Sequence, residues 1–333
     1  MLKISRISIC AAIFFACLSV QTFSADKIYL GVFDNDKTKN LDDLSGVETF
    51  ERDAGKKVAI IHVFQAWGAK NGKNQFNVNA MNAIRSHGSI PLLTWAPRAL
   101  HEKENEPEYA LKNIINGKYD GYIIKFASDI KGWKHPLFLR FAHEMNGNWY
   151  PWAEGVNGNV SGEYVKAWHY VHDLFKRNQV TNVTWVWCPS RKNSKHKKLS
   201  ELYPGDDYVD WLGIDGYNDT RFKGWQSFAE VFGGAYHEMA GLSGKPIMIA
   251  EFSSMEAGGK KSVWISKTLS STITAKFPRI KAVIWLNHKF SSELDWRIES
   301  SVSSQRAFAE SVASPLYCDN KFGSLDVSPI SAP

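Results

Sequence analysis

Two glutamates stand at the ends of hydrophobic, strand-like runs and could carry acid and base chemistry. Glu144 follows Leu139-Arg-Phe-Ala-His143, and Glu251 follows Ile247-Met-Ile-Ala250. Cleavage of a glycosidic bond needs two such carboxyl groups, one protonated to expel the leaving sugar and one ionised to attack the anomeric carbon or activate water. If the fold brings the two together, the sequence predicts glycoside cleavage with Glu144 and Glu251 as the catalytic residues.

The elements that must position these glutamates form a repeating pattern. Segments with helical period alternate with short apolar runs, for example Ser161–Gln179, which carries one apolar stripe. Eight apolar strands alternating with helices predict a single-domain α/β fold, a (β/α)8 TIM barrel, with its active site at the C-terminal strand ends. The eight predicted strands are 28–33, 58–64, 90–95, 137–142, 183–187, 211–217, 247–252 and 282–286.

Side-chain alternation predicts which residues face the barrel interior. Glu144, Glu251 and Tyr217 should reach the mouth, and Arg140 and Asp215 should lie one layer below, where two buried charges would pair. The inner face of the fourth strand should carry Phe138, Arg140, Ala142 and Glu144, that of the sixth Gly213, Asp215 and Tyr217, and that of the seventh Ile247, Ile249 and Glu251.

Tryptophans at or beyond the strand ends are candidates for stacking on sugar rings. The chain has 13 tryptophans, and we favour substrate contact over core filling for Trp67, Trp95, Trp149, Trp152 and Trp285. His143 and Asn218 lie beside the two strands that carry the glutamates. They are candidates for recognising the axial or equatorial 2-hydroxyl of the sugar by hydrogen bonds.

Metal and cofactor motifs are incomplete. His143-Glu-Met-Asn-Gly147 lacks the second histidine of a zinc-binding helix, and Ala257–Lys261 lacks a full glycine-rich phosphate signature. We expect no metal and no cofactor.

The N-terminus has the three-part pattern of a secretory signal. Lys3 and Arg6 precede the apolar run Ile7–Val20, which is shorter than the roughly 20 residues of a membrane-spanning helix. We predict a signal peptide at 1–25, a barrel domain at 26–318, and a loose Ser-, Pro- and Gly-rich tail at 319–333. The mature protein would be secreted, either outside the cell or into a periplasm. For Cys188 and Cys318 we favour two unpaired thiols over the single bridge that an oxidising compartment would allow.

The net charge of the chain is small. Losing Lys3 and Arg6 would lower the formal net charge from +6 to +4, which does not suggest a nucleic-acid partner. The basic run 191–198 is interpreted as a solvated loop in preference to a site for an anionic polymer. We expect a polysaccharide substrate, no membrane span and a monomer.

The segment Leu139-Arg-Phe-Ala-His-Glu-Met-Asn-Gly-Asn-Trp-Tyr-Pro-Trp152 resembles the acid/base segment of glycoside hydrolase family 26. Trp211–Asn218 is similar to that family's sixth strand and Ile249–Phe252 to its nucleophile strand. Ile284–Asn287 with Asp295–Arg297 is similar to its eighth strand and following loop.

This resemblance implies a retaining hydrolase, most often an endo-β-mannanase, with Glu144 as acid/base and Glu251 as nucleophile. It also implies that His143 lies beside the acid, that Trp149 lies near the cleavage point, that Tyr217 hydrogen-bonds the nucleophile, and that Trp285 is a sugar platform. Trp149-Tyr-Pro-Trp152 departs from the mannanase pattern Trp-Phe-Trp-Trp and is similar to a β-glucanase branch. The resemblance favours β-mannan, with mixed-linkage β-1,3-1,4-glucan or xylan as alternatives.

Two other classes stay open. A barrel that binds glycans without cutting them would normally have lost one carboxylate, and both are present here. An inverting hydrolase would hold its carboxyl groups further apart than a retaining one, a distance that sequence does not give.

Overall fold

The structure is a computed structural model, and it describes residues 27–34, 41–69, 72–100, 105–191 and 198–333. The predicted signal peptide therefore lies outside the described residues, as does most of the basic run 191–198. None of the helices in the described part of the chain combines the length and apolarity needed to cross a bilayer.

Eight parallel strands form a closed barrel, as predicted. Each strand pairs with its neighbours in chain order, and β1 pairs with β10 to close the ring. A short ninth strand, β11 (Tyr317–Cys318), pairs with the start of β1. The barrel strands are β1 (Ile28–Phe33), β2 (Ile60–Ala66), β5 (Ile90–Ala96), β6 (Leu137–Phe141), β7 (Val183–Trp187), β8 (Trp211–Asn218), β9 (Ile247–Ser254) and β10 (Ile280–Leu286).

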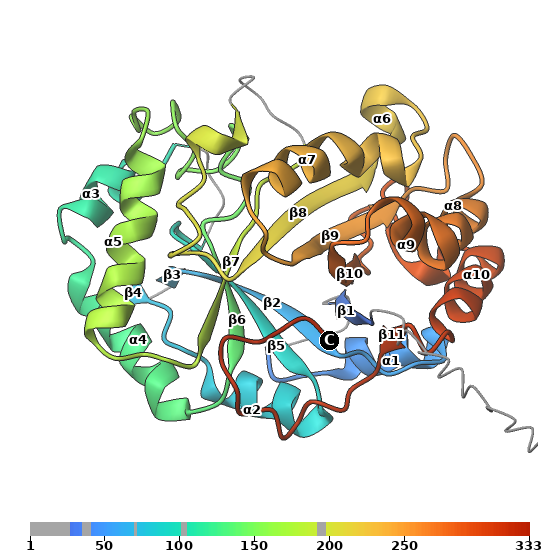
Figure 1. Ribbon diagram of the computed structural model, residues 1–333, viewed down its shortest axis with the longest axis horizontal. Helices are drawn as coiled ribbons and strands as arrows, with labels where there is room; N and C mark the ends of the chain where they lie inside the picture. Colours follow the sequence, from blue (N-terminus) through green and yellow to red (C-terminus); the bar gives the residue numbers. More distant parts are fainter. Residues whose placement is uncertain (1–26, 35–40, 70–71, 101–104, 192–197) are drawn as a thin grey trace, which may run out of the picture.

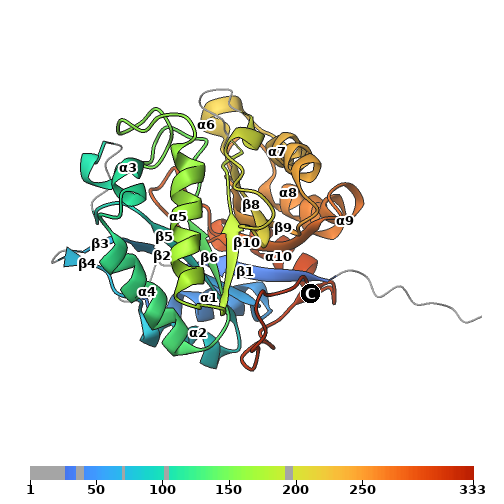
Figure 2. The same ribbon diagram turned by 60° about the vertical axis from the view of Figure 1, so that its left-hand side comes forward.

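Helices surround the strands on the outside (Figures 1 and 2). A small antiparallel hairpin, β3 (Gly68–Ala69) with β4 (Gly72–Lys73), follows β2. The predicted stripe 161–179 forms α5. The α-helices are α1 (Ser45–Ala54), α2 (Val78–His87), α3 (Leu111–Ile115), α4 (Asp120–Trp133), α5 (Glu163–Arg177), α6 (Thr220–Lys223), α7 (Phe228–Leu242), α8 (Lys261–Lys267), α9 (Ile273–Lys276) and α10 (Val302–Val312).

Two apolar layers hold the barrel together. One buried cluster contains residues from all eight strands, including Tyr29, Phe138, Trp211 and Ile284, so it fills the barrel interior. A larger cluster lies between the outer strand faces and the helices. Ala142 belongs to this outer cluster, so the prediction that it shares the inner face with Glu144 is wrong. Ile247 and Ile249 also belong to it, so the prediction that they share the inner face with Glu251 is wrong.

A β-bulge in β9 explains that error. Ile214 and Asp215 are consecutive in β8, but they pair with Ile249 and Glu251, so Ala250 is an extra residue in β9. A bulge places two successive residues toward the same side of a strand. Ala250 therefore joins the interior cluster, and Glu251 still faces the barrel mouth.

The C-terminal segment closes the other end of the barrel, so the prediction of a loose tail is wrong. Ile330 is 2% exposed, its backbone N donates to Thr184 Oγ1 (2.8 Å), and its carbonyl accepts from Trp211 Nε1 (2.7 Å). Arg85 in α2 donates to the Leu325 carbonyl (2.7 Å), and the tail runs beside α2 in Figure 1. Its Ser and Pro content concealed these anchors, because only three apolar side chains, Phe322, Leu325 and Ile330, and a few backbone groups make them.

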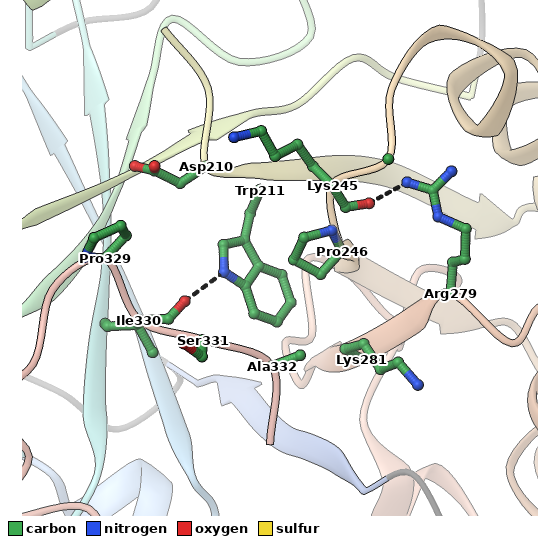
Figure 3. A pocket seen from close by; sticks show the side chains of 11 residues that line it. Asp210, Trp211, Lys245, Pro246, Arg279, Lys281, Pro329, Ile330, Ser331 and Ala332 are labelled. Carbon is green, nitrogen blue, oxygen red and sulfur yellow. Dashed lines mark hydrogen bonds between the residues drawn. The ribbon is translucent and has the colours of Figure 1, made fainter. Parts of the chain in front are cut away.

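A hollow of about 430 Å³ lies beside this tail, lined by Trp211, Lys245, Arg279 and residues 329–332 (Figure 3). It opens at the N-terminal ends of the strands, far from both glutamates. In parallel barrels this end serves stability, while chemistry sits at the opposite end. We therefore assign it to the structural end of the molecule.

Ile330→Ala should destabilise the full-length chain by about 2–5 kcal/mol, because it empties a buried site that the barrel cannot refill. Val327→Ala is the matched control, since Val327 in the same tail is 62% exposed and such changes stay within about 0.5 kcal/mol. Urea unfolding measures both. Equal midpoints for the two variants would contradict a docked tail.

Candidate active site

The structure brings Glu144 and Glu251 together at the C-terminal end of the barrel. Glu144 follows β6, and Glu251 lies at the bulge of β9. Burial and the negative charge of Glu251 raise the pKa of Glu144 to about 7. A carboxyl group with this pKa is half protonated near neutral pH, as a general acid requires.

Glu251 is held by one donor on each carboxylate oxygen. Arg140 donates to Oε1 and the Tyr217 hydroxyl donates to Oε2. Burial and the charge of Glu251 raise the pKa of Tyr217 well above its usual range, so Tyr217 remains a neutral donor. Together the two contacts fix the orientation of the Glu251 carboxyl group.

Arg140 is fully buried and contacts four side chains through oxygen or nitrogen atoms, and its Nη1 also lies 3.6 Å from Cys188 Sγ. Its Nη1 donates to Asp215 Oδ2 (2.6 Å), its Nε donates to Thr94 Oγ1 (2.6 Å), and its Nη2 donates to Glu251 and to His62 Nε2 (3.2 Å). The predicted Arg140–Asp215 pair is therefore confirmed. The two carboxylates raise the pKa of Arg140 against the effect of burial, so the guanidinium keeps its charge.

The buried charge of Arg140 argues against a metal ion at this position. Within the described residues, one group of side chains could converge on a cation: His143, Asp215 and Glu251, with ligand atoms within 4.8 Å of one another. Arg140 already supplies a positive charge to both carboxylates. A metal ion there would have to displace or repel a buried guanidinium, so these residues do not fit a metal site.

The backbone around Glu144 is strained. Ala142 has φ of 45° and Glu144 has φ of 53°, both in the left-handed region that non-glycine residues rarely occupy. The Glu144 backbone N donates to the Cys188 carbonyl (2.7 Å), which ties this turn to the end of β7. Strain of this kind collects at functional sites, where the surrounding structure holds it in place.

The residues after Glu144 fix its side chain. Trp149 Nε1 donates to Glu144 Oε2 (2.7 Å), and a Cβ on Gly147 would lie 2.5 Å from the Trp149 ring, so only glycine fits there. Asn146 exchanges two hydrogen bonds with the Ser190 backbone (2.7 and 2.8 Å). The Ser190 side chain in turn hydrogen-bonds Glu144 and, like Trp149, favours its ionised form.

A sequence model of the family described as "Glycosyl hydrolase family 26" matches residues 21–266. The chain belongs to this family. Endoglucanase H of Acetivibrio thermocellus is 37% identical over 275 residues, which cover 80% of this chain and 29% of that protein. The mannan endo-1,4-beta-mannosidase A and B of Caldalkalibacillus mannanilyticus is 29% identical over 46% of this chain and 28% of its own length.

The chain thus spans less than a third of the length of these two relatives. Among solved structures, the catalytic domain of the Bacillus sp. JAMB-750 GH26 endo-beta-1,4-mannanase superposes with a TM-score of 0.69 at 18% identity, covering 91% of each chain. That similarity shows a shared (β/α)8 fold.

In this family 26 member, four of the five predicted substrate tryptophans are buried. Trp67, Trp95, Trp152 and Trp285 have 0% exposed surface, so the prediction that they contact the sugar is wrong. The physical reason is alternation: Thr94 and Ile284 point into the barrel, so their neighbours Trp95 and Trp285 point out. Trp95 stacks on Phe126 of α4 (ring centroids 4.5 Å apart), and Trp285 packs on Phe308 of α10 (5.2 Å).

Trp285 acts on the mouth indirectly. Its Nε1 donates to the Trp296 carbonyl (3.0 Å), and Ser253 Oγ donates to the same oxygen (2.7 Å). The Trp296 ring then packs beside Tyr217, with centroids 5.1 Å apart. Trp296 rather than Trp285 is the tryptophan next to the side chains that hold Glu251.

Neither Asn218 nor His143, the residues predicted to hydrogen-bond the sugar 2-hydroxyl, is placed to do so. Asn218 is fully buried; its amide donates to Ser254 Oγ (2.9 Å) and accepts from the Gln226 backbone N (2.9 Å), so both ends are used. His143 is 2% exposed, lies 3.2 Å from the Tyr150 hydroxyl, and has its pKa lowered by burial and Arg140. It is therefore a neutral, buried side chain.

A cavity of about 200 Å³ opens beside Glu144. Its lining includes Trp149, the one predicted tryptophan that reaches it, together with Tyr217. The full set is Glu144, Trp149, Ser190, Arg191, Gly216, Tyr217 and Asp219. Sequence reasoning missed Ser190, Arg191 and Asp219, although each directly follows a predicted strand or its terminal turn, which is the available signal.

If Glu144 is the general acid, the pH dependence of kcat/KM should show an alkaline limb near pH 7, because the acid form is lost as Glu144 ionises. Carbon-13 NMR of labelled glutamate carboxyls can follow Glu144 directly. Glu251→Gln removes the charge that raises its pKa, so the Glu144 pKa should fall. Trp149→Phe removes a hydrogen bond that lowers it, so the pKa should rise.

The expected result is a lower Glu144 pKa in Glu251→Gln and a higher Glu144 pKa in Trp149→Phe. Shifts in the same direction would contradict the assigned couplings.

Proposed function

We propose that the chain is a retaining endo-β-glycanase. The observation that carries this proposal is the contrast between the two carboxyl groups: Glu251 is fixed by hydrogen bonds from Arg140 and Tyr217, while burial and the charge of Glu251 raise the pKa of Glu144 to about 7. One acid and one nucleophile are what double displacement needs. Family membership supports the same assignment.

In the first step, a Glu251 carboxylate oxygen attacks the anomeric carbon while Glu144 gives its proton to the departing glycosidic oxygen. The bond between that carbon and oxygen breaks, and a glycosyl ester on Glu251 remains. In the second step, the Glu144 carboxylate takes a proton from water, which attacks the same carbon and releases Glu251.

The proposed substrate is a β-1,4-linked or mixed-linkage glucan. The sequence pattern favoured β-mannan, but the relative that matches 80% of the chain is an endoglucanase, whereas the mannanase relative matches 46%. β-Mannan is the second candidate, supported by the mannanase relatives. We further propose that the protein acts after export, with residues 1–25 removed.

Glu251→Ala should lower kcat on polysaccharide at least about 1,000-fold, since the attacking atom is gone. Glu144→Ala should instead spare formation of the glycosyl-enzyme from aryl glycosides, whose leaving groups need little protonation, and stall its hydrolysis. Added azide needs no general base, so it should restore turnover of Glu144→Ala and yield a β-glycosyl azide.

Glu293→Ala is the matched control, because Glu293 is an exposed carboxylate on the loop after β10. Full activity of Glu251→Ala would end the nucleophile assignment. An α-glycosyl azide from Glu144→Ala would show inversion in place of retention.

Initial rates on barley β-glucan, galactomannan and xylan compare the substrates directly. We expect kcat/KM on β-glucan to exceed that on galactomannan at least about tenfold, a difference of about 1.4 kcal/mol in transition-state binding. The reverse ratio would move the chain to the mannanases and leave both glutamate roles intact.

A further inference from the structure

Arg191 forms one wall of the cavity beside Glu144 and has no role in the chemistry described above. It lies just after β7, four residues beyond Trp187, and is half-buried. The same cavity contains the acid, Glu144, and the Trp149 ring that contacts it. Any group that occupies this cavity therefore meets the acid, a flat aromatic surface and a guanidinium.

The structure holds Arg191 in a defined position. Its backbone N donates to the Asp215 carbonyl (2.7 Å), and its Nη1 donates to Gln226 Oε1 (3.2 Å). Its aliphatic stem runs against Gly216, where a Cβ would lie 2.9 Å from Arg191 Cδ. Gln226 is fixed in turn by Asn218. The buried Asn218 amide thus supports the guanidinium rather than touching substrate.

The guanidinium is incompletely satisfied. Its Nη2 is shielded from solvent and has no hydrogen-bond partner in the described structure. Arginine carries five N–H donors and no acceptor, and an unpaired buried donor is costly. The missing partner must be an acceptor. The Asp219 carboxylate lines the same cavity, but both of its oxygens accept hydrogen bonds from Arg221. Sugar hydroxyls are the acceptors that the proposed function brings to this cavity.

The chemistry indicates which sugar this is. Glu251 attacks the anomeric carbon from one face, so the leaving sugar departs from the other, and Glu144 protonates the oxygen of that departing sugar. The sugar nearest the outer side of Glu144 is therefore the leaving one. A cavity of about 200 Å³ is smaller than the roughly 300–1,000 Å³ of sites for drug-sized ligands, in keeping with a single ring.

We infer that Arg191 binds the first sugar on the leaving-group side by donating hydrogen bonds to its hydroxyls, with Trp149 as the adjoining aromatic surface. This inference rests on the proposed function. It makes Arg191 a substrate-binding residue that helps decide which polysaccharide is cleaved, and it makes Gln226 and Asn218 positioning residues.

The test compares two leaving groups. Arg191→Met should lower kcat/KM for a β-1,4-linked glucose tetrasaccharide about 10- to 100-fold, the scale of a hydrogen bond to a charged group. On a dinitrophenyl β-cellobioside, whose leaving group has no sugar hydroxyls, the change should stay within about twofold. Retained activity on the aryl substrate also shows that the variant folds.

Lys223→Met is the matched control. It removes another positive charge just after β8, but Lys223 is exposed and does not line the cavity. Its kcat/KM should stay within about twofold on both substrates. Equal losses on both substrates for Arg191→Met would give Arg191 a purely structural role, and no loss on either would remove it from the sugar site.

A binding measurement tests this inference separately from the proposed function. In the Glu251→Ala background, Arg191→Met should weaken the Kd for the same tetrasaccharide about tenfold, measured by calorimetry. If the unmodified chain cleaves no glycan, the proposed function fails, and this Kd ratio still decides the role of Arg191. An unchanged Kd, or no binding in either protein, would overturn the inference.

Discussion

The buried guanidinium of Arg140 is the interaction on which the site depends. It lies inside the barrel between Asp215 and Glu251, with no exposed surface, and its other donors are used by Thr94 and His62. Removing one partner of such a group leaves an uncompensated buried charge, which costs about 3–5 kcal/mol. The same contacts orient Glu251 at the mouth. Stability of the upper barrel and orientation of the proposed nucleophile therefore have one physical origin.

Around this charge cluster, the regular barrel geometry is broken in two places. Ala142 and Glu144 adopt left-handed backbone conformations, and Ala250 forms a bulge in β9. Left-handed non-glycine residues cost about 1–3 kcal/mol each. Both distortions change the direction of the side chains that follow them, and each precedes or contains one of the two glutamates at the mouth. The strain is concentrated where the two carboxyl groups are brought face to face.

The two ends of the barrel have different roles. At the N-terminal end, Ile330 and the tail complete the interior apolar cluster beneath Trp211. At the C-terminal end, polar groups replace apolar ones, and a small cavity opens beside Glu144. The barrel is a single domain, so the free energy gained by packing at the N-terminal end contributes to the stability of the whole. It can offset the cost of the buried charges and of the incompletely paired Arg191 at the C-terminal end.

The sequence by itself determined the eight strands, the barrel, the family and the pairing of Arg140 with Asp215, because these follow from periodicity and from charges placed on apolar strands. It misjudged Trp95 and Trp285, Ile247 and Ile249, Asn218 and the tail. Each error has the same cause: which way a side chain points depends on bulges, strained turns and contacts between distant segments. The tertiary structure alone decided that Trp296 lies beside Tyr217, that Ile330 seals the barrel, and that Arg191 faces the cavity, because residues far apart in sequence define each of these positions.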